Sequence, residues 1–426
     1  MNKKPRRRDE QMTAIKAIQK KLLGKKLSYR EIYAIMDEIA QERLTDILTT
    51  YFVASSFREG YSPQELYFFT RAMVETGNQL KFKGIVADKH SVGGIAGTRT
   101  TMIIVPIVAA AGFRIPKISS RAITSPAGTA DVMGSIAKVE FTPREIEKIV
   151  GKIGGCIAWN GKLGIAPADD IIIRVEEPLG FESFDKIIIS VMAKKVATGA
   201  THLALDLPYG KTAKIRHFAD AEKVAKKFEN LARRFKIKTA IDINEMLEPA
   251  GRGIGPILEA RDVLYVLEQD KDRPLRLEAK AVRLAGMLLN LCYKDSKKKP
   301  LTGSGEEEAR RLLESGAALK KFREIVGAQD GDSDIASGSL RLSAFKKELI
   351  SSVSGKIKDI NNYNLNTIAK ILGSPNDYKA GIYLLKKLDH EVDKNETMMI
   401  LYSSDKYRLK EAEVTIKNLP IFKIEN

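Results

Sequence analysis

The stretch GIVADKHSVGGIAGTRTTMIIVPIVAAAGFRIPKI, residues 84–118, carries the clearest fold signal in this chain of 426 residues. It opens with a short apolar run and a glycine-rich loop, a helix is expected over 101–111, and a second apolar run follows at 114–118. Two more apolar runs, at 204–207 and 238–243, have the length and composition of buried strands. Buried strands that alternate with helices are typical of a mostly parallel sheet covered by helices. We therefore predict an α/β domain in the middle of the chain.

Apolar residues at helical spacing mark the region before this domain, residues 10–80. Ser28 is followed three residues later by Glu31, and Ser62 stands directly before Pro63. Both patterns are signals for the start of a helix. The region is therefore predicted to be a small all-helical domain.

The pattern changes again from about residue 340, where short strands and turns surround one helix expected over 365–372. This pattern of short strands and turns around one helix favours a separate α+β domain. Another helix is expected over 184–198. The predicted fold class is thus α/β, with a small all-helical domain, a larger α/β domain on a mixed or parallel sheet, and a C-terminal α+β domain.

The composition narrows the classes of function. The net charge is +17, but the lysines and arginines are spread along the chain, which fits a protein for small anionic substrates better than a nucleic-acid-binding protein. No window approaches the roughly 18–20 apolar residues of a membrane helix, and the polar, basic first twenty residues do not resemble a secretory signal. We expect a cytoplasmic protein with no membrane and no nucleic-acid partner.

Residues 88–101, DKHSVGGIAGTRTT, form the first candidate site. A strand, a glycine loop and a helix in this order direct backbone N–H groups and the positive end of a helix toward an anion. The spacing matches neither GxxxxGK[ST] nor GxGxxG. The residues themselves leave two interpretations open, an anion site or a structural turn.

Residues 116–131, PKISSRAITSPAGTAD, form the second candidate site. Hydroxyls and an arginine follow a strand there, and ligands collect at the carboxyl ends of strands in open α/β sheets. Such a loop can also consist only of turns and caps. Further on, Ser190 and Lys194 share one helix face at spacing i,i+4, with Arg174 and Glu182 upstream. GRGIGP, residues 251–256, is interpreted as a hinge or close-packing loop.

The motifs DKHSVGG, SSRAITSPAGTAD, APADDIIIRVE, ATHLALDLPYGKTAK and PAGRGIGPILEARDVL occur in this order and together resemble the thymidine phosphorylase family, also called the class II nucleoside phosphorylases. The likeness is greater to the branch that contains AMP phosphorylase and putative thymidine phosphorylases, and it runs from about residue 28 to the end. It implies an active cleft between the first two domains. The implied domains are 1–80 with 164–198, 81–163 with 199–335, and 340–426.

The resemblance also implies roles for individual residues. It gives catalytic roles to Glu182, His90 and Arg174, with Glu182 at the position where the branch has an aspartate proton donor. It implies that the phosphate is bound by Lys89, Ser91, Thr101, Ser119 and Thr129. It implies that the nucleotide or base is bound by Gly94, Ser120, Arg121, Ala122, Ile123, Thr124, Ser125, Thr129, Ser190, Lys194 and Lys214. Thr98 departs from the Asp or Asn of many relatives.

Two substrates fit this resemblance. The motif SSRAITS and Lys214 favour a nucleoside 5′-monophosphate, with AMP and phosphate giving adenine and ribose 1,5-bisphosphate. The alternative is thymidine phosphorylase, with thymine and 2-deoxyribose 1-phosphate as products. The residues compatible with a pyrimidine are His90, Arg174, Ser190 and Lys194.

Two other classes of function are weighed against the phosphorylase. Transferases that use phosphoribosyl pyrophosphate and magnesium would need an acidic pair near the phosphate loop, where Thr98 is not acidic. A nucleic-acid-binding protein without enzymatic activity is the other contrast. For the phosphorylase we predict no metal and no cofactor. Inorganic phosphate would be the co-substrate, with a monovalent cation near Gly93 and Glu259 by analogy. The chain begins at the helical domain without the additional amino-terminal domain of archaeal AMP phosphorylases, which favours a homodimer.

Overall fold

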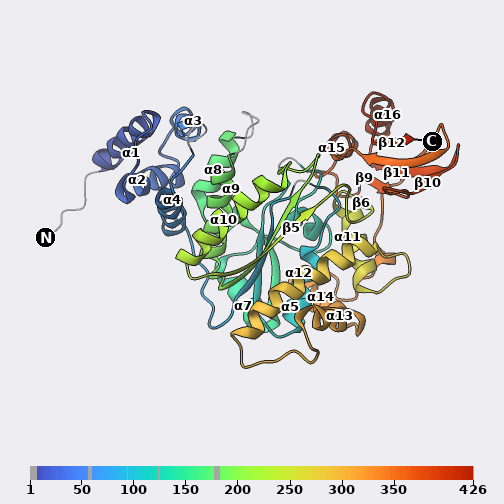
Figure 1. Cartoon of the computed structure of the whole chain (residues 1–426), viewed down its shortest axis with the longest axis horizontal. Coiled ribbons are helices and arrows are strands. Elements are labelled where there is room, and N and C mark those ends of the chain that lie inside the picture. Colours follow the sequence, from blue (N-terminus) through green and yellow to red (C-terminus); the bar gives the residue numbers. More distant parts are fainter. Residues whose placement is uncertain (1–6, 56–59, 94, 123–124, 177–182, 426) are drawn as a thin grey trace.

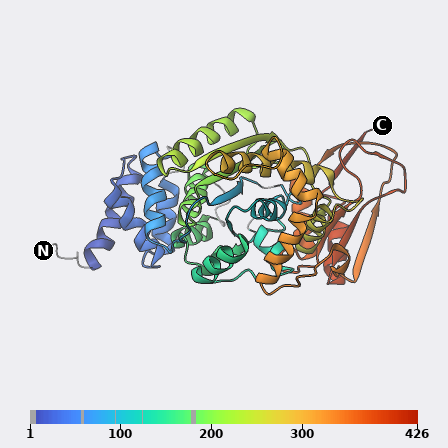
Figure 2. The same cartoon turned by 90° about the horizontal axis from the view of Figure 1, so that it is seen from below.

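The computed structural model describes residues 7–55, 60–93, 95–122, 125–176 and 183–425. Three lobes follow one another along the long axis of the molecule (Figure 1). We call them the helical lobe, the α/β lobe and the C-terminal lobe. The same order is visible from below (Figure 2). The predicted fold class is confirmed.

Two separate segments of the chain build the helical lobe. The first supplies α1 (Arg7–Leu22), α2 (Tyr29–Ala40), α3 (Asp46–Ser55) and α4 (Pro63–Glu75), and the second supplies α8 (Pro167–Glu176) and α9 (Phe184–Ala197). The side chains of Ser28 and Ser62 accept the expected capping hydrogen bonds at the starts of α2 and α4. Because α8 packs on α2 and α3, and α9 packs on α4, the second segment lies between the first segment and the sheet.

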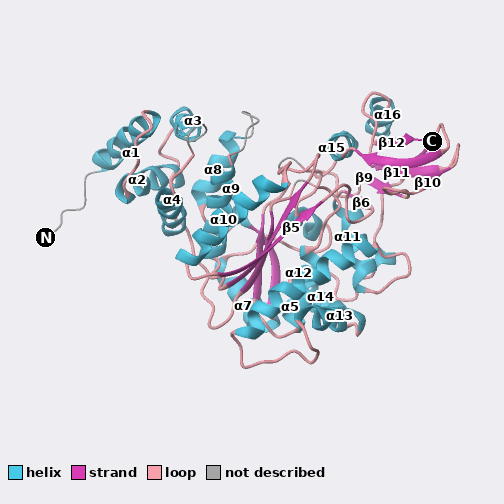
Figure 3. Ribbon diagram, viewed as in Figure 1, coloured by secondary structure: helices cyan, strands magenta, loops and turns pink. Residues whose placement is uncertain are grey.

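Parallel strands form the centre of the α/β lobe (Figure 3). Strands β1 (Ala87–Ser91), β4 (His202–Tyr209) and β5 (Lys238–Glu245) pair in the order β1–β4–β5. Strands β2 (Ile115–Ser119) and β3 (Gly155–Trp159) form a second parallel pair, and one parallel bridge between Val86 and Arg114 links the two groups. The helices of this lobe are α5 (Thr101–Ala110), α6 (Thr129–Gly134), α7 (Pro143–Ile153), α10 (Phe218–Arg234), α11 (Pro256–Leu267), α12 (Leu275–Lys294), α13 (Gly305–Glu314) and α14 (Ala317–Ala328).

Strand β4 is buried on both faces. Leu203 and Leu205 belong to a core that includes Phe228 of α10, whereas Ala204 belongs to a core that includes Val105 of α5. Alternate side chains of a strand point to opposite faces of the sheet, so both faces are covered. This explains why the strand reads in the sequence as a continuous apolar run.

The C-terminal lobe contains two small sheets and two helices. One sheet has the order β6–β9–β11–β7 and the other β10–β8–β12. Their strands are β6 (Gly253–Ile254), β7 (Phe345–Ile350), β8 (Gly355–Ile360), β9 (Gly381–Leu384), β10 (Glu391–Val392), β11 (Thr397–Ser403) and β12 (Phe422–Glu425), and the helices are α15 (Asn362–Leu372) and α16 (Lys406–Thr415).

Strand β6 lies in the stretch 251–256, which is interpreted from the sequence as a hinge or close-packing loop. Gly253 and Ile254 pair antiparallel with β9, so this loop supplies an edge strand to the C-terminal lobe. The close packing is present as well, because a Cβ atom on Gly253 would lie 2.3 Å from the backbone oxygen of Leu258.

None of the described helices combines the length and apolar character that a membrane crossing requires.

Candidate active site

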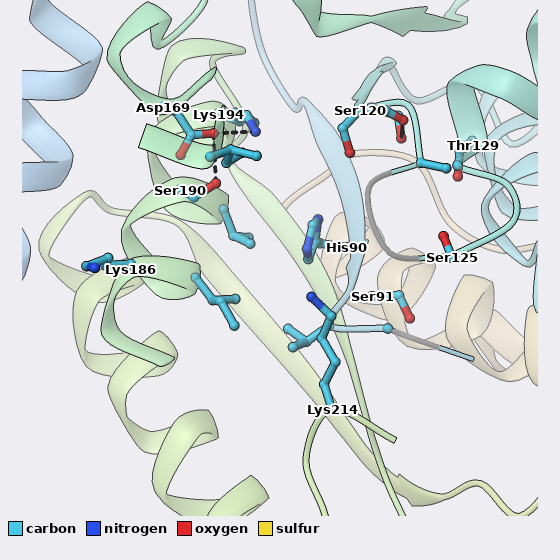
Figure 4. Close-up of a pocket in the computed structure, with 18 of the residues that line it drawn as sticks. His90, Ser91, Ser120, Ser125, Thr129, Asp169, Lys186, Ser190, Lys194 and Lys214 are labelled. Carbon is cyan, nitrogen blue, oxygen red and sulfur yellow. Dashed lines mark hydrogen bonds and ion pairs between the residues drawn. The ribbon is translucent and has the colours of Figure 1, made fainter. Parts of the chain in front are cut away.

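A cavity of about 700 Å³ lies where the three lobes meet (Figure 4). The helical lobe contributes side chains from α2, α4, α8 and α9, among them Phe69 and Ser190. The α/β lobe contributes the ends of β1 and β2 and the loops that follow them, and the C-terminal lobe contributes Tyr363. The carboxyl ends of neighbouring parallel strands therefore open into this cavity, as is usual for ligand sites in α/β folds.

Lys89 lies on the cavity wall near the start of α5. Its ammonium group donates to Thr100 Oγ1 at 2.9 Å and to Thr101 Oγ1 at 3.5 Å, and it lies 3.9 Å from Asp206 Oδ2. Burial lowers the pKa of Lys89 to about 8, while the carboxylate of Asp206 opposes this shift. An ammonium group beside hydroxyls at the start of a helix is well placed to bind an anion.

The other predicted phosphate ligands line the same cavity, namely Ser91, Thr101, Ser119 and Thr129. The hydroxyl of Ser91 donates to the carboxylate of Asp206. The hydroxyl of Thr129 accepts a hydrogen bond of 3.1 Å from Arg99 Nη1. The sequence motifs at 88–101 and 116–131 are thus brought to one site, although they follow different strands.

The loop after β2 forms one side of the cavity. Ser120, Arg121, Ala122 and Ser125 line it. Asp131 holds the loop, since its Oδ2 accepts the backbone N–H groups of Ala122 at 2.6 Å and of Gly128 at 2.8 Å. Lys214 also lines the cavity (Figure 4). Gly94, Ile123 and Thr124, also predicted to contact the nucleotide, lie outside the described residues.

Ser190 and Lys194 project from α9 on the side opposite that loop (Figure 4). Both are held by the buried carboxylate of Asp169, whose Oδ2 accepts from Ser190 Oγ at 2.9 Å and pairs with Lys194 Nζ at 2.5 Å. Burial lowers the pKa of Lys194, but the charge of Asp169 outweighs it, so the net shift is upward. Lys194 therefore presents a fixed positive charge to the cavity.

His90 lies between α9 and the serine-rich loop (Figure 4). Its enclosure by the protein, together with the ammonium groups of Lys195 and Lys117, holds the pKa of His90 well below its usual range. The imidazole is therefore neutral at pH 7. A neutral imidazole can donate one hydrogen bond and accept another, which suits the polar edge of a base.

Of the three predicted catalytic residues, His90 lines the cavity, Arg174 lies away from it, and Glu182 cannot be placed. Arg174 does not line it: its Nη2 instead donates to Asp46 Oδ1 at 3.0 Å, and more than half of its side chain is exposed. The pairing with Asp46 arises because α8 packs against α3, a long-range contact that the sequence does not reveal. Glu182 lies outside the described residues.

Several cavity residues were missed by the sequence interpretation. Arg99 and Lys117 stand inside the two quoted motifs, so the positive charge of those motifs was a usable signal. Asp206 stands inside the apolar run at 204–207, and Lys280 lies in the second turn of α12 without any local motif. Only the tertiary structure could bring these last two residues into the site.

Glu259, predicted by analogy to lie near a monovalent cation, is buried and paired with Arg99. Arg99 Nε donates to Glu259 Oε2 at 2.9 Å, and Arg99 Nη2 lies 2.7 Å from the same oxygen. Among the described residues, the carboxylates grouped closely enough to hold a metal ion are Glu10, Asp37 and Glu38. These three do not line the cavity.

Comparison with known families gives three consecutive matches. Residues 15–77 match the helical bundle domain of the glycosyl transferase family, and residues 83–319 match the a/b domain of the same family. Residues 356–421 match the C-terminal domain of pyrimidine nucleoside phosphorylases.

Curated relatives are similar over nearly the whole chain. AMP phosphorylase from Methanocaldococcus jannaschii is 40% identical over 98% of this chain and 82% of its own length. AMP phosphorylase 1 from Archaeoglobus fulgidus is 40% identical over 96% and 80%. AMP phosphorylase from Thermofilum pendens is 41% identical over 94% and 76%.

Two solved structures share the fold at low sequence identity. Anthranilate phosphoribosyltransferase from Thermus thermophilus has a TM-score of 0.60 at 18% identity, covering 74% of this chain and 99% of its own. The enzyme from Saccharomyces cerevisiae, solved in complex with PRPP and Mg, has a TM-score of 0.58 at 14% identity, covering 75% and 99%. At this low sequence identity, the likenesses show the fold alone.

Proposed function

The chain belongs to the glycosyl transferase family, and we propose that it is an AMP phosphorylase, which converts AMP and inorganic phosphate to adenine and ribose 1,5-bisphosphate. The observation that carries this proposal is the identity of about 40%, over nearly the full length, with curated AMP phosphorylases from several archaea. The cavity supports it independently, because its many cationic side chains suit a reaction with two phosphate groups.

The two ends of the cavity suit the two substrates. Inorganic phosphate would bind beside Lys89, Ser91 and Thr129, at the ends of β1 and β2. AMP would extend from the serine-rich loop and Lys214 toward α9. The base would then lie near His90, Ser190 and Lys194. This arrangement would orient the phosphate toward C1′ of the ribose, and such orientation is a large part of catalysis between two bound reactants.

The reaction needs charge stabilisation at the base. A phosphate oxygen forms a bond to C1′ while the bond from C1′ to the adenine nitrogen breaks, and the bonding electrons leave with the base. In this proposal Lys194 and Ser190 stabilise the negative charge that develops there. Glu182 in its protonated form supplies the proton that completes adenine.

Further parts of the proposal concern the state of the protein. A homodimer is supported by the large apolar side chains exposed at the outer end of the helical lobe, among them Leu23, Ile47 and Tyr51. A cytoplasmic location is supported by Cys156 and Cys292, which are free thiols. We propose that no metal cofactor takes part, and activity in excess chelator would support this.

The decisive experiment is a base-release assay with AMP, CMP, UMP, adenosine, uridine and thymidine, each with and without phosphate. We expect adenine release from AMP that depends on phosphate, with ribose 1,5-bisphosphate as the second product. Release from thymidine with none from any monophosphate would reject the proposal in favour of a thymidine phosphorylase. Release from AMP without phosphate would show hydrolysis instead of phosphorolysis.

A further inference from the structure

Lys280 is a buried lysine that reaches the cavity from α12. Its ammonium group donates to Asp206 Oδ1 at 2.8 Å and to Asn244 Oδ1 at 2.6 Å. Within the described part of the chain these two acceptors leave a third N–H for another partner. The side chain is only 7% exposed, yet it is part of the cavity wall.

Asp206 is shared between two lysines. Lys280 contacts one carboxylate oxygen, and Lys89 lies 3.9 Å from the other. Each of the three charged side chains is at most 7% exposed. Both ammonium groups hold the pKa of Asp206 below its usual range against the opposing effect of burial, so the carboxylate is ionised.

The neighbouring charges do not neutralise this group. Asp242 of β5 lies opposite Asp206 in the register, and its carboxylate pairs with Arg283 at 2.7 Å. Arg99, on the other side of Lys89, pairs with Glu259. The group of Lys89, Asp206 and Lys280 therefore carries two positive charges and one negative charge in a largely dry environment. A buried charge without a counterion is costly, so an anion that enters the cavity is attracted to this group.

We propose that Lys280 raises the affinity of the cavity for inorganic phosphate, and that it acts by giving the group formed with Lys89 and Asp206 an excess of one positive charge. The inference rests on the proposed phosphorylase function. It adds to that function a residue from α12, far in the sequence from the motifs at 88–101 and 116–131. Asn244 orients Lys280, because its amide accepts from Lys280 and donates to Asp206 Oδ1 at 2.8 Å.

The test measures binding of inorganic phosphate to the full chain by isothermal titration calorimetry, without any nucleotide. Lys280→Met removes the charge excess, and the dissociation constant for phosphate should rise about 10- to 100-fold, the usual range for lost hydrogen bonds to charged groups. Lys294→Met is the matched control: it removes an exposed cation from the same helix, and Lys294 does not line the cavity. The dissociation constant of this control should stay within about twofold of the wild-type value, because solvent and salt screen an exposed charge.

The double variant Lys280→Met/Asp206→Asn separates charge excess from a direct contact. It removes one positive and one negative charge together, which restores the excess on Lys89. Phosphate affinity should therefore recover by about tenfold relative to Lys280→Met. Replacing both partners of a buried pair is also tolerated better than breaking it, so this variant serves if Lys280→Met does not fold.

The outcomes are distinct. Unchanged phosphate affinity in Lys280→Met would overturn the proposal, as would a double variant no better than the single one. If neither the wild type nor any variant binds phosphate, the charge group is not a phosphate site and the proposal fails. If the wild type binds phosphate with the expected variant pattern but releases no adenine from AMP, the charge group is supported and the AMP phosphorylase proposal fails.

Discussion

Asp206 of β4 lies directly opposite Ser91 of β1 in the parallel register, and its carboxylate accepts the hydroxyl hydrogen of Ser91. The register explains why two residues 115 positions apart meet at one end of the cavity. In the proposed phosphate site, phosphate would compete with Asp206 for the hydroxyl of Ser91. Lys89, whose ammonium group lies 3.9 Å from the same carboxylate oxygen, would then contribute more to phosphate affinity than Ser91.

We predict that kcat/KM for phosphate falls as pH rises through about 8. Burial, with Lys280 and Arg99 nearby, lowers the pKa of Lys89 to about 8 although Asp206 opposes the shift. Below this pH the ammonium group is charged and attracts phosphate, and above it the charge is lost. The pH profile of kcat/KM reports the free enzyme, so the transition should lie near this pKa. Lys89→Arg, which keeps its charge, should show no fall between pH 7 and 9, and a flat wild-type profile would contradict the prediction.

Asp169→Asn should weaken the helical-lobe side of the cavity. The substitution leaves Lys194 without its ionised partner in a mostly buried position, and the free energy of unfolding should fall by about 3 kcal/mol. KM for AMP should rise more than KM for phosphate, because Asp169 orients Ser190 and Lys194. Asp170→Asn is the control, because Asp170 is the next residue on the same helix and does not line the cavity. Urea unfolding and steady-state kinetics measure both effects, and equal results for the two variants would refute the assignment.

Gly97→Ala should destabilise the protein more than an ordinary turn substitution. Gly97 has a φ of +64°, and a Cβ atom there would lie 2.7 Å from Ile254 Cδ1 and 2.8 Å from the backbone oxygen of Gly253. Gly84→Ala is a matched control, because Gly84 has a φ of +76° and nothing within 4 Å of such an atom. The control should lose about 1 kcal/mol from left-handed backbone strain, and Gly97→Ala about 2–3 kcal/mol. Similar losses in denaturant melts would exclude a role for close packing.

Glu182→Gln tests the proposed proton donor. The amide cannot donate an acidic proton to the departing base, so kcat should fall by about two to four orders of magnitude. Affinity for phosphate should be unchanged, because in the proposal Glu182 acts at the base. A turnover near the wild-type rate with AMP would exclude Glu182 as the general acid.

The sequence predicted the parts of the fold whose signals are local. The apolar run that became β4 and the capping residues Ser28 and Ser62 are examples. The motifs Lys89 to Thr101 and Ser119 to Thr129 were also recognisable in the sequence, and both line one cavity, while phosphate binding there stays a prediction. Their convergence on one cavity follows from parallel pairing, which brings the carboxyl ends of strands to one edge.

Long-range contacts explain what the sequence could not predict. Arg174 directly follows the cavity residue Ile173, yet α3 supplies Asp46 as its partner. Lys280 has no motif around it, and only the packing of α12 on β4 brings it to Asp206. Asp169 was quoted within a motif, but the hydrogen bond that it accepts from Ser190 joins α8 to α9, and the sequence does not reveal this long-range contact.

The strand β6 ties the C-terminal lobe to the loop that contains Gly97. Its residues come from the α/β segment but hydrogen-bond to β9, and the adjoining Gly251 donates its N–H to Gly97 at 2.7 Å. Lys387 also donates to the carbonyl oxygen of Gly251, at 2.8 Å. Tyr363, from the same lobe, completes the cavity wall. A chain that ends near residue 340 would therefore not keep the cavity intact. Replacing this lobe with that of another protein would require replacing residues 249–255 as well.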